Sequence, residues 1–143
     1  MQITKLTMED IKNQIEMIQA EMIYTNFNPD LICGIQLGGL VPALMLAKKF
    51  HYPHIGTIEL GAMGKPIYKK QKGERILIID DIADSGQTFL NTVNEFQLMY
   101  PEAEIKTAAL VYKVHTSKWN PDYKGVTTNS NAWIQYPWEW NDE

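Results

Sequence analysis

The sequence contains a single cysteine, Cys33, which lies in an apolar run. A disulfide framework within the chain is therefore excluded, and Cys33 is expected to be a core residue. No apolar run approaches the length that spans a bilayer, and the N-terminus, polar from Gln2, carries no apolar signal segment. These absences predict a soluble, cytoplasmic protein without a membrane span.

The chain also lacks an excess of positive charge, internal repeats and linkers. Thirteen Lys and Arg stand against 17 Asp and Glu, and the net charge of −4 argues against nonspecific nucleic-acid binding. The nucleotide-binding patterns GxxxxGK(S/T) and GxGxxG are absent. His51, His54 and His115 show no metal-site spacing with Cys33, so no zinc site is predicted. A length of 143 residues predicts one domain, 1–143.

The most informative stretch is Arg75–Thr88. Its apolar run, Ile76–Ile79, is typical of a strand buried on both faces of a parallel sheet. Two carboxylates, Asp80 and Asp81, follow at once, and helical spacing begins at Phe89. The pattern predicts a buried strand that runs into an acidic turn and then into a helix.

The start of this helix has the features of a phosphate site. A helix N-terminus offers free N–H groups, Gly86 allows close approach of the backbone, and Ser85 and Thr88 add hydroxyl donors. The carboxylates of Asp80 and Asp81 are suited to ribose hydroxyls or to Mg²⁺. A phosphorylated ribose with a metal ion would use all of these groups. The alternative is an ordinary helix cap, which needs one such residue rather than a run of them.

A second strand enters a glycine turn earlier in the chain. Leu31–Ile35 reads as a buried strand, the pair Gly38 and Gly39 follows, and Pro42 stands near the first turn of a helix that extends to about Phe50. Paired glycines allow close approach of a ligand, but tight packing of helix on strand explains them equally well.

The remaining elements complete an alternating pattern. Thr7–Asp10 resembles a capping box and opens a packing helix through Met22. Ile55–Leu60 and Ile105–Tyr112 read as strands, the second of which ends at Lys113. The predicted fold is α/β, a mostly parallel twisted sheet flanked by helices, with these strand ends at one edge.

The acidic stretch resembles the ribose-phosphate signature of the type I phosphoribosyltransferases, two acids, two variable residues and then Asp-(Ser/Thr)-Gly-x-Thr. In that family the signature binds 5-phosphoribosyl 1-diphosphate (PRPP). The glycine pair resembles the family's pyrophosphate loop, in which the residue before the glycines is commonly basic and is here Leu37. The resemblance implies the family's fold, a Mg²⁺ cofactor and a metal ligand at Asp81. The PRPP contacts that it implies are Leu37, Gly38, Gly39, Asp80, Asp81, Ala83, Asp84, Ser85, Gly86, Gln87 and Thr88.

The tail Asn131–Glu139 resembles the C-terminal Trp-Ile-x-x-Pro-Trp-acid segment of the bacterial xanthine-guanine phosphoribosyltransferases. The resemblance implies that Trp133 stacks on a purine and that the backbone of Trp133 and Ile134 meets its C2 edge. It also implies that Lys113 meets O6 and that Asp84 is the catalytic residue, near N7 as acid or base. The chain would then divide into a core of about 1–112 and a base-binding hood of about 113–143.

The segment between the predicted strands Ile55–Leu60 and Ile76–Ile79 suits the family's flexible lid. Lys65, Lys69, Lys70 and Lys72 would meet a diphosphate there, and a solvated hairpin explains the segment equally well.

The resemblance implies a purine phosphoribosyltransferase of nucleobase salvage, which converts PRPP and guanine, xanthine or hypoxanthine to a nucleoside monophosphate and pyrophosphate. It also implies a homo-oligomer, a dimer or a tetramer. One alternative is a regulatory protein of the same fold that binds PRPP or a nucleotide with weak or no turnover. The uncharged Leu37 and the short lid would suit such a protein. The other is an orotate or uracil enzyme, against which the tail argues.

Overall fold

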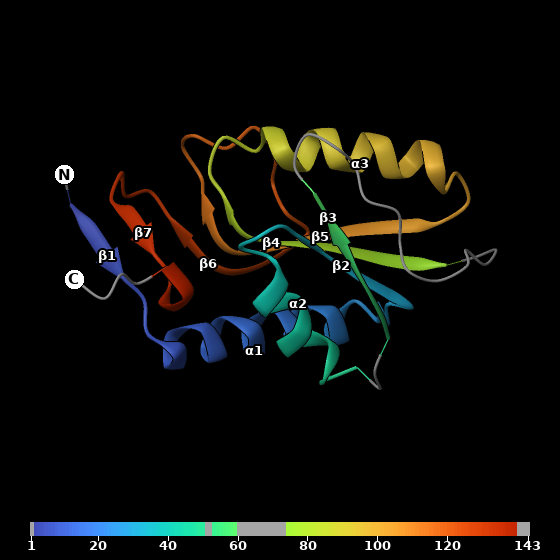
Figure 1. Cartoon of the computed structure of the whole chain (residues 1–143), viewed down its shortest axis with the longest axis horizontal. Coiled ribbons are helices and arrows are strands. Elements are labelled where there is room, and N and C mark those ends of the chain that lie inside the picture. The colour runs from blue at the N-terminus through green and yellow to red at the C-terminus, as the bar shows by residue number, and fades with distance from the viewer. Residues whose placement is uncertain (1, 51–52, 60–73, 140–143) are drawn as a thin grey trace.

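The computed structural model describes residues 2–50, 53–59 and 74–139. A central parallel sheet has the strand order β3-β2-β4-β5-β6, with α3 over one face and α1 and α2 over the other (Figure 1). The elements of this body are α1 (Met8–Tyr24), β2 (Leu31–Ile35), α2 (Leu40–Ala47), β3 (His54–Ile58), β4 (Arg75–Ala83), α3 (Gln87–Met99), β5 (Glu104–Lys113) and β6 (Tyr123–Thr128). The α/β fold with a mostly parallel sheet is therefore confirmed.

The two faces of the central strands enter two different clusters. Leu77 and Ile79 pack toward α1 and α2, whereas Ile76 and Ile78 pack toward α3. Successive side chains of a strand point to opposite faces, so the unbroken apolar run serves both clusters at once. Cys33 lies in the α3 cluster as a free, buried thiol, as predicted.

The first helix follows its prediction closely. The Thr7 hydroxyl accepts from the Asp10 amide (3.1 Å), and the Asp10 carboxylate accepts from the Thr7 amide (2.8 Å), which completes the capping box. The second helix ends at Ala47 rather than near Phe50, and Pro42 lies in its first turn. None of the helices in the described ranges has the length and apolar character that crossing a bilayer requires.

The acidic strand is longer than predicted. The prediction of an acidic turn after Ile79 was wrong, because β4 continues through both carboxylates to Ala83. The neighbouring strand β5 provides the reason, since it supplies ladder partners for Asp80, Ile82 and Ala83. The turn begins only at Asp84.

A second, two-stranded sheet lies beyond the carboxyl edge of the main sheet (Figure 1). It pairs β1 (Ile3–Lys5) in parallel with β7 (Trp133–Gln135), and a short 3₁₀ turn, Pro137–Glu139, follows. The predicted boundary near residue 112 does not coincide with these sheets, because β6 extends the main sheet and the N-terminal strand joins the small one. The predicted lid lies outside the described residues.

Candidate functional site

The acidic pair occupies the end of β4 at the carboxyl edge of the sheet. The Asp81 amide donates to Asp80 Oδ1 (2.8 Å), which fixes the two residues relative to each other. Burial, followed by the charge of Asp81, raises the pKa of Asp80 to about 9. Burial likewise raises the pKa of Asp81. The pair therefore retains a proton at neutral pH unless a cation approaches it.

This donor set fits Mg²⁺. It consists of carboxylate oxygens whose burial is not offset by any basic side chain of the described residues, and a divalent cation would remove that imbalance. Among the described residues no cluster of three or more His, Cys, Asp or Glu is arranged to bind a metal ion. Mg²⁺ commonly takes one or two protein carboxylates and completes its shell with water and substrate phosphates. The residues present suit a metal that arrives with a phosphorylated ligand.

The glycine loop packs directly on the acidic strand. A Cβ atom at Gly38 would overlap the Asp81 carboxylate, and one at Gly39 would overlap the Ile79 carbonyl. Side chains are excluded at both positions because the loop backbone approaches β4 so closely. The preceding residue, Leu37, is 77% exposed and contributes no charge. The glycine pair therefore packs tightly on β4 and also lies beside Asp81, the candidate metal ligand.

The start of α3 forms a small cavity beside the acidic pair. Gly86 caps the helix with a φ of 81°, a left-handed conformation that favours glycine. The loop after β5 packs behind it, since a Cβ at Gly86 would lie 2.5 Å from the Trp119 amide nitrogen. A cavity of about 140 Å³ opens in front, lined by Asp80, Ile82, Asp84, Ser85, Gly86, Thr88 and Phe89.

Two residues predicted to contact PRPP point elsewhere. The Ala83 side chain is buried in the α3 cluster, so only its backbone faces a ligand. The Gln87 side chain donates to Asn91 along the helix (2.8 Å), and its backbone amide donates to Ser85 Oγ (3.3 Å). Any contact that these two residues make with a phosphate would come from the main chain.

A larger cavity lies between the acidic strand and the small sheet. Its volume is about 230 Å³, and it is lined by Asp81, Ile82, Asp84, Lys113, Trp133, Ile134, Tyr136 and Glu139. Trp133 is 54% exposed, so its ring is accessible to a flat ligand. Every residue predicted to bind the base therefore lines one cavity, and Ile82 and Asp84 line both cavities.

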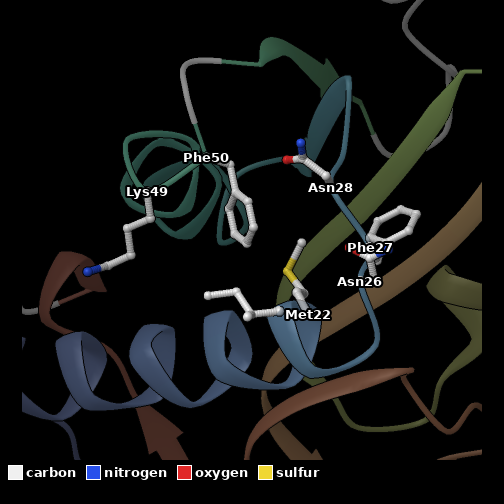
Figure 2. Close-up of a pocket in the computed structure, with 7 residues that line it drawn as sticks. Met22, Asn26, Phe27, Asn28, Lys49 and Phe50 are labelled. Atoms are coloured by element: carbon white, nitrogen blue, oxygen red, sulfur yellow. The ribbon is translucent and has the colours of Figure 1, made fainter.

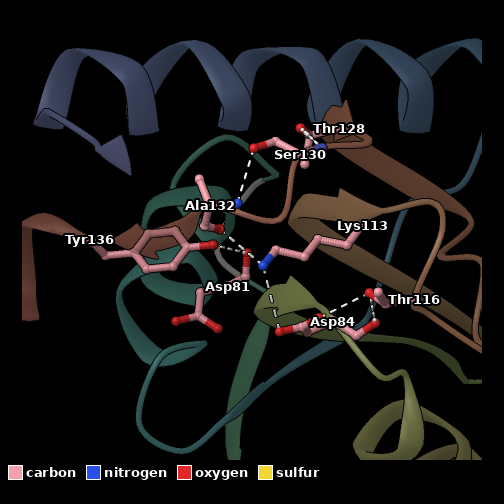
Figure 3. Close-up of polar contacts among 8 residues, drawn as sticks. All are labelled: Asp81, Asp84, Lys113, Thr116, Thr128, Ser130, Ala132 and Tyr136. Carbon is pink, nitrogen blue, oxygen red and sulfur yellow. Dashed lines mark hydrogen bonds and ion pairs between the residues drawn. The ribbon is translucent and has the colours of Figure 1, made fainter. Parts of the chain in front are cut away.

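Lys113 is a buried lysine at the end of β5. Its ammonium donates to the Ala132 carbonyl (3.1 Å) and lies 3.8 Å from Asp84 Oδ2 (Figure 3). A lysine at the end of a strand is commonly exposed on the surface, whereas Lys113 is buried. The ammonium stands at the junction of β5, the loop before β7 and the acidic turn.

Three polar residues in or beside the cavities were not predicted. The Tyr136 hydroxyl donates to the Asp81 carbonyl (2.8 Å) (Figure 3). The Tyr136 ring stacks on Trp138. Glu139 lines the larger cavity and accepts from the Tyr136 amide (2.9 Å). The Thr116 hydroxyl donates to Asp84. Tyr136 and Glu139 lay within the quoted tail segment, whereas Thr116 had no local signal.

A third cavity lies away from these groups. It measures about 280 Å³ and is lined by Met22, Ile23, Asn26, Phe27, Asn28, Lys49 and Phe50 (Figure 2). These residues come from the ends of α1 and α2 and from the loop before β2, so the cavity opens at the opposite edge of the sheet. It has one charged lining residue and no carboxylate, so the candidate site remains the pair of cavities around Asp84.

Comparison with known proteins places this geometry in context. Residues 56–141, more than half of the chain, match the phosphoribosyl transferase domain family. The purine phosphoribosyltransferase from Pyrococcus horikoshii is 28% identical, with a TM-score of 0.84 over 100% of this chain and 97% of that chain.

Two other solved structures share the fold. The Helicobacter pylori xanthine-guanine-hypoxanthine phosphoribosyltransferase is 20% identical, with a TM-score of 0.79 over 96% of this chain and 93% of that one. A hypothetical protein from Neisseria gonorrhoeae with bound ppGpp is 21% identical, with a TM-score of 0.77 over 99% and 91%.

Proposed function

The chain belongs to the phosphoribosyl transferase domain family, and on that premise we propose that it is a purine phosphoribosyltransferase of cytoplasmic nucleobase salvage. It would transfer the 5-phosphoribosyl group of PRPP to a 6-oxopurine, guanine, xanthine or hypoxanthine. The products would be a nucleoside monophosphate and pyrophosphate. The proposed unit is the single domain 1–143, acting as a homo-oligomer.

The observation that supports this proposal most directly is that two cavities of different chemistry meet at Asp84. The smaller one combines a helix N-terminus, two hydroxyls and the Asp80 carboxylate, which suit a ribose phosphate. The larger one combines an accessible indole ring, that of Trp133, with the ammonium of Lys113, which suit a flat base with a carbonyl oxygen. A ligand that spans both would place its sugar–base bond beside Asp84.

The proposed chemistry replaces one bond at ribose C1 by another. The bond from C1 to the diphosphate oxygen breaks, and pyrophosphate leaves with its electron pair. N9 of the purine forms the new bond to C1 with its lone pair, and the proton on N7 passes to the Asp84 carboxylate. That carboxylate is half exposed, at 50%, and lines both cavities, which is where a base near N7 is required.

The other residues would position the reactants. The glycine loop would present backbone N–H groups to the diphosphate, with no help from the uncharged Leu37. Trp133 would stack on the purine. The Lys113 ammonium would donate to O6 and also to the Ala132 carbonyl, as it does in the structure. Mg²⁺ bound by Asp81, beside Asp80, would neutralise charge on the diphosphate as it leaves. Most of the rate enhancement would then come from positioning and charge stabilisation.

The test is a PRPP- and Mg²⁺-dependent assay with guanine, xanthine, hypoxanthine, adenine, orotate and uracil. Turnover of at least one of the first three, and little or none of the others, is expected. Asp81→Asn should lower turnover by about 100-fold or more. Asp30→Asn is a matched control, because Asp30 is exposed and bonds to Arg75 at the opposite edge of the sheet. Preferred turnover of orotate, uracil or adenine would contradict the proposal.

A regulatory protein of the same fold is the second candidate. The observation that favours it is the exposed, uncharged Leu37 in the loop where a basic residue would contact pyrophosphate. Such a protein would bind PRPP or a purine nucleotide in titration calorimetry but would release no pyrophosphate with any base. Pyrophosphate release in the same preparation would contradict this alternative.

A further inference from the structure

Thr116 contacts Asp84 at two atoms. Its hydroxyl oxygen lies 2.9 Å from the Asp84 main-chain oxygen and 3.0 Å from Asp84 Oδ1 (Figure 3). A hydroxyl has one proton, so it donates to one of these acceptors at a time, and both belong to the same residue. The contact therefore ties the carboxylate to its own backbone and restricts rotation about χ1 of Asp84.

The other carboxylate oxygen faces a different side chain. Lys113 Nζ lies 3.8 Å from Asp84 Oδ2, so each oxygen of the carboxylate has its own neighbour. Asp84 itself lies in the turn between β4 and α3 and not in either element. A half-exposed side chain in a turn samples several rotamers unless other groups restrain it. Lys113 restrains the Asp84 carboxylate through an ion pair, whereas Thr116 restrains it through a directional hydrogen bond without adding charge.

We propose that Thr116 is a positioning residue, which orients the Asp84 carboxylate toward the purine ring nitrogen that gives up its proton. This inference rests on the proposed purine transfer and adds to it a residue outside both cavities. Thr116 lines neither of them, whereas Asp84 lines both. Its effect on the reaction would therefore pass through Asp84.

A purely structural role is the competing explanation, since the same hydroxyl also bonds to main chain. Two backbone contacts make the distinction possible, because they do not depend on the Thr116 side chain. The Lys118 amide donates to the Ser85 carbonyl (2.7 Å), and the Ser117 amide donates to the Lys113 carbonyl (3.0 Å). The first bond joins the loop after β5 to the acidic turn and the second closes the turn of that loop, so we expect the loop to stay in place when the hydroxyl is removed.

The first experiment compares Thr116→Val, which removes the hydroxyl at nearly constant volume, with Thr116→Ser, which retains it. Thr127→Val is the matched control, because Thr127 is exposed on β6 and lines neither cavity. We expect Thr116→Val to lower kcat by about 10- to 100-fold, with the KM for PRPP and the melting temperature nearly unchanged. Thr116→Ser should retain most of the activity, and Thr127→Val all of it.

The second experiment repeats Thr116→Val in an Asp84→Ala background, measured by single-turnover kinetics. If Thr116 acts through the carboxylate, the second substitution should add no further loss. A purely structural contact would persist in that background, because the main-chain oxygen of residue 84 is still present. An equal loss in both backgrounds, or a KM effect as large as the kcat effect, would overturn the proposal.

Failure of this inference is distinguishable from failure of the proposed function. If the wild type turns over a purine and Thr116→Val matches it, only the role of Thr116 is wrong. If the wild type turns over no base, the proposed function is wrong, and a crystal structure of Thr116→Val still tests the geometry. A carboxylate of Asp84 unmoved in that structure would contradict the positioning role.

Discussion

Replacing Asp80 by asparagine should stabilise the ligand-free protein, and the gain should grow as the pH rises from 5 to 8. Ionisation of the wild-type carboxyl is disfavoured in a partly buried site beside Asp81, which is why its pKa rises from the ordinary 3.8 to about 9. Asparagine carries no charge, and its Oδ1 can still accept the Asp81 amide hydrogen bond that the carboxylate accepts in the wild type.

The direction and size of this change in the free energy of unfolding follow from proton linkage. Between pH 3.8 and pH 9 the folded wild type retains a proton on Asp80 that the unfolded chain has released. The contribution of this group to stability is therefore complete below pH 3.8 and is lost progressively as the pH rises toward 9. Each pH unit in that window lowers the free energy of unfolding by about 1.4 kcal/mol. From pH 5 to pH 7 the loss is about 3 kcal/mol, a large share of a typical total of about 5–15 kcal/mol.

Urea denaturation followed by tryptophan fluorescence at several pH values, in a chelator, measures this directly. The difference in unfolding free energy between Asp80→Asn and wild type should widen with pH. Asp30→Asn controls for the loss of one negative charge, because Asp30 is exposed at the opposite edge of the sheet. Parallel stability profiles for wild type and Asp80→Asn would show that Asp80 ionises normally, and would refute the reasoning from burial.

The other predictions concern single positions around the two cavities. Leu37→Arg should lower the KM for PRPP, because the exposed position can present a guanidinium to the diphosphate; an unchanged or higher KM would mean that the loop needs no charge. Gly86→Ala should lower the free energy of unfolding by about 2 kcal/mol and weaken nucleotide binding, since φ is 81° and the new Cβ would meet Trp119; a calorimetric titration with GMP and a urea curve measure both. Trp133→Ala should weaken all purines alike, whereas Lys113→Ala should selectively impair 6-oxopurines, because adenine presents a donor where they present O6. A Lys113→Ala variant that retains its preference for 6-oxopurines in competition assays would contradict the assignment.

The parts of the site that are local in sequence were predictable from it. A strand buried on both faces needs an unbroken apolar run, and Ile76–Ile79 is one. A helix N-terminus that approaches a ligand needs glycine and hydroxyl donors, and Ser85, Gly86 and Thr88 supply them within four positions. The capping box of Thr7 and Asp10 is likewise formed within one turn. Each of these requirements is met by residues that lie next to one another, so the pattern is visible before folding.

Residue roles in the tail became predictable through a family resemblance and not through local physics. Nothing in the composition of Asn131–Glu139 says that Trp133 faces a cavity while Tyr136 is buried. The structure brings both residues to the carboxyl edge of the main sheet, where β7 pairs with β1 from the other end of the chain. The roles proposed for Trp133 and Lys113 await the substitutions described above.

The sequence by itself determined four of the five strands of the central sheet, with β6 not among them, the helix that follows the acidic pair, and the residue types that gather near its start. Only the tertiary structure decided that Asp80 and Asp81 lie on a strand, that Lys113 is buried against Ala132, and that Thr116 contacts Asp84. The physical reason is that strand length depends on the partner alongside, here β5, and that burial and charge depend on what packs against a side chain. Those partners come from positions far apart in the sequence, so no local pattern encodes them.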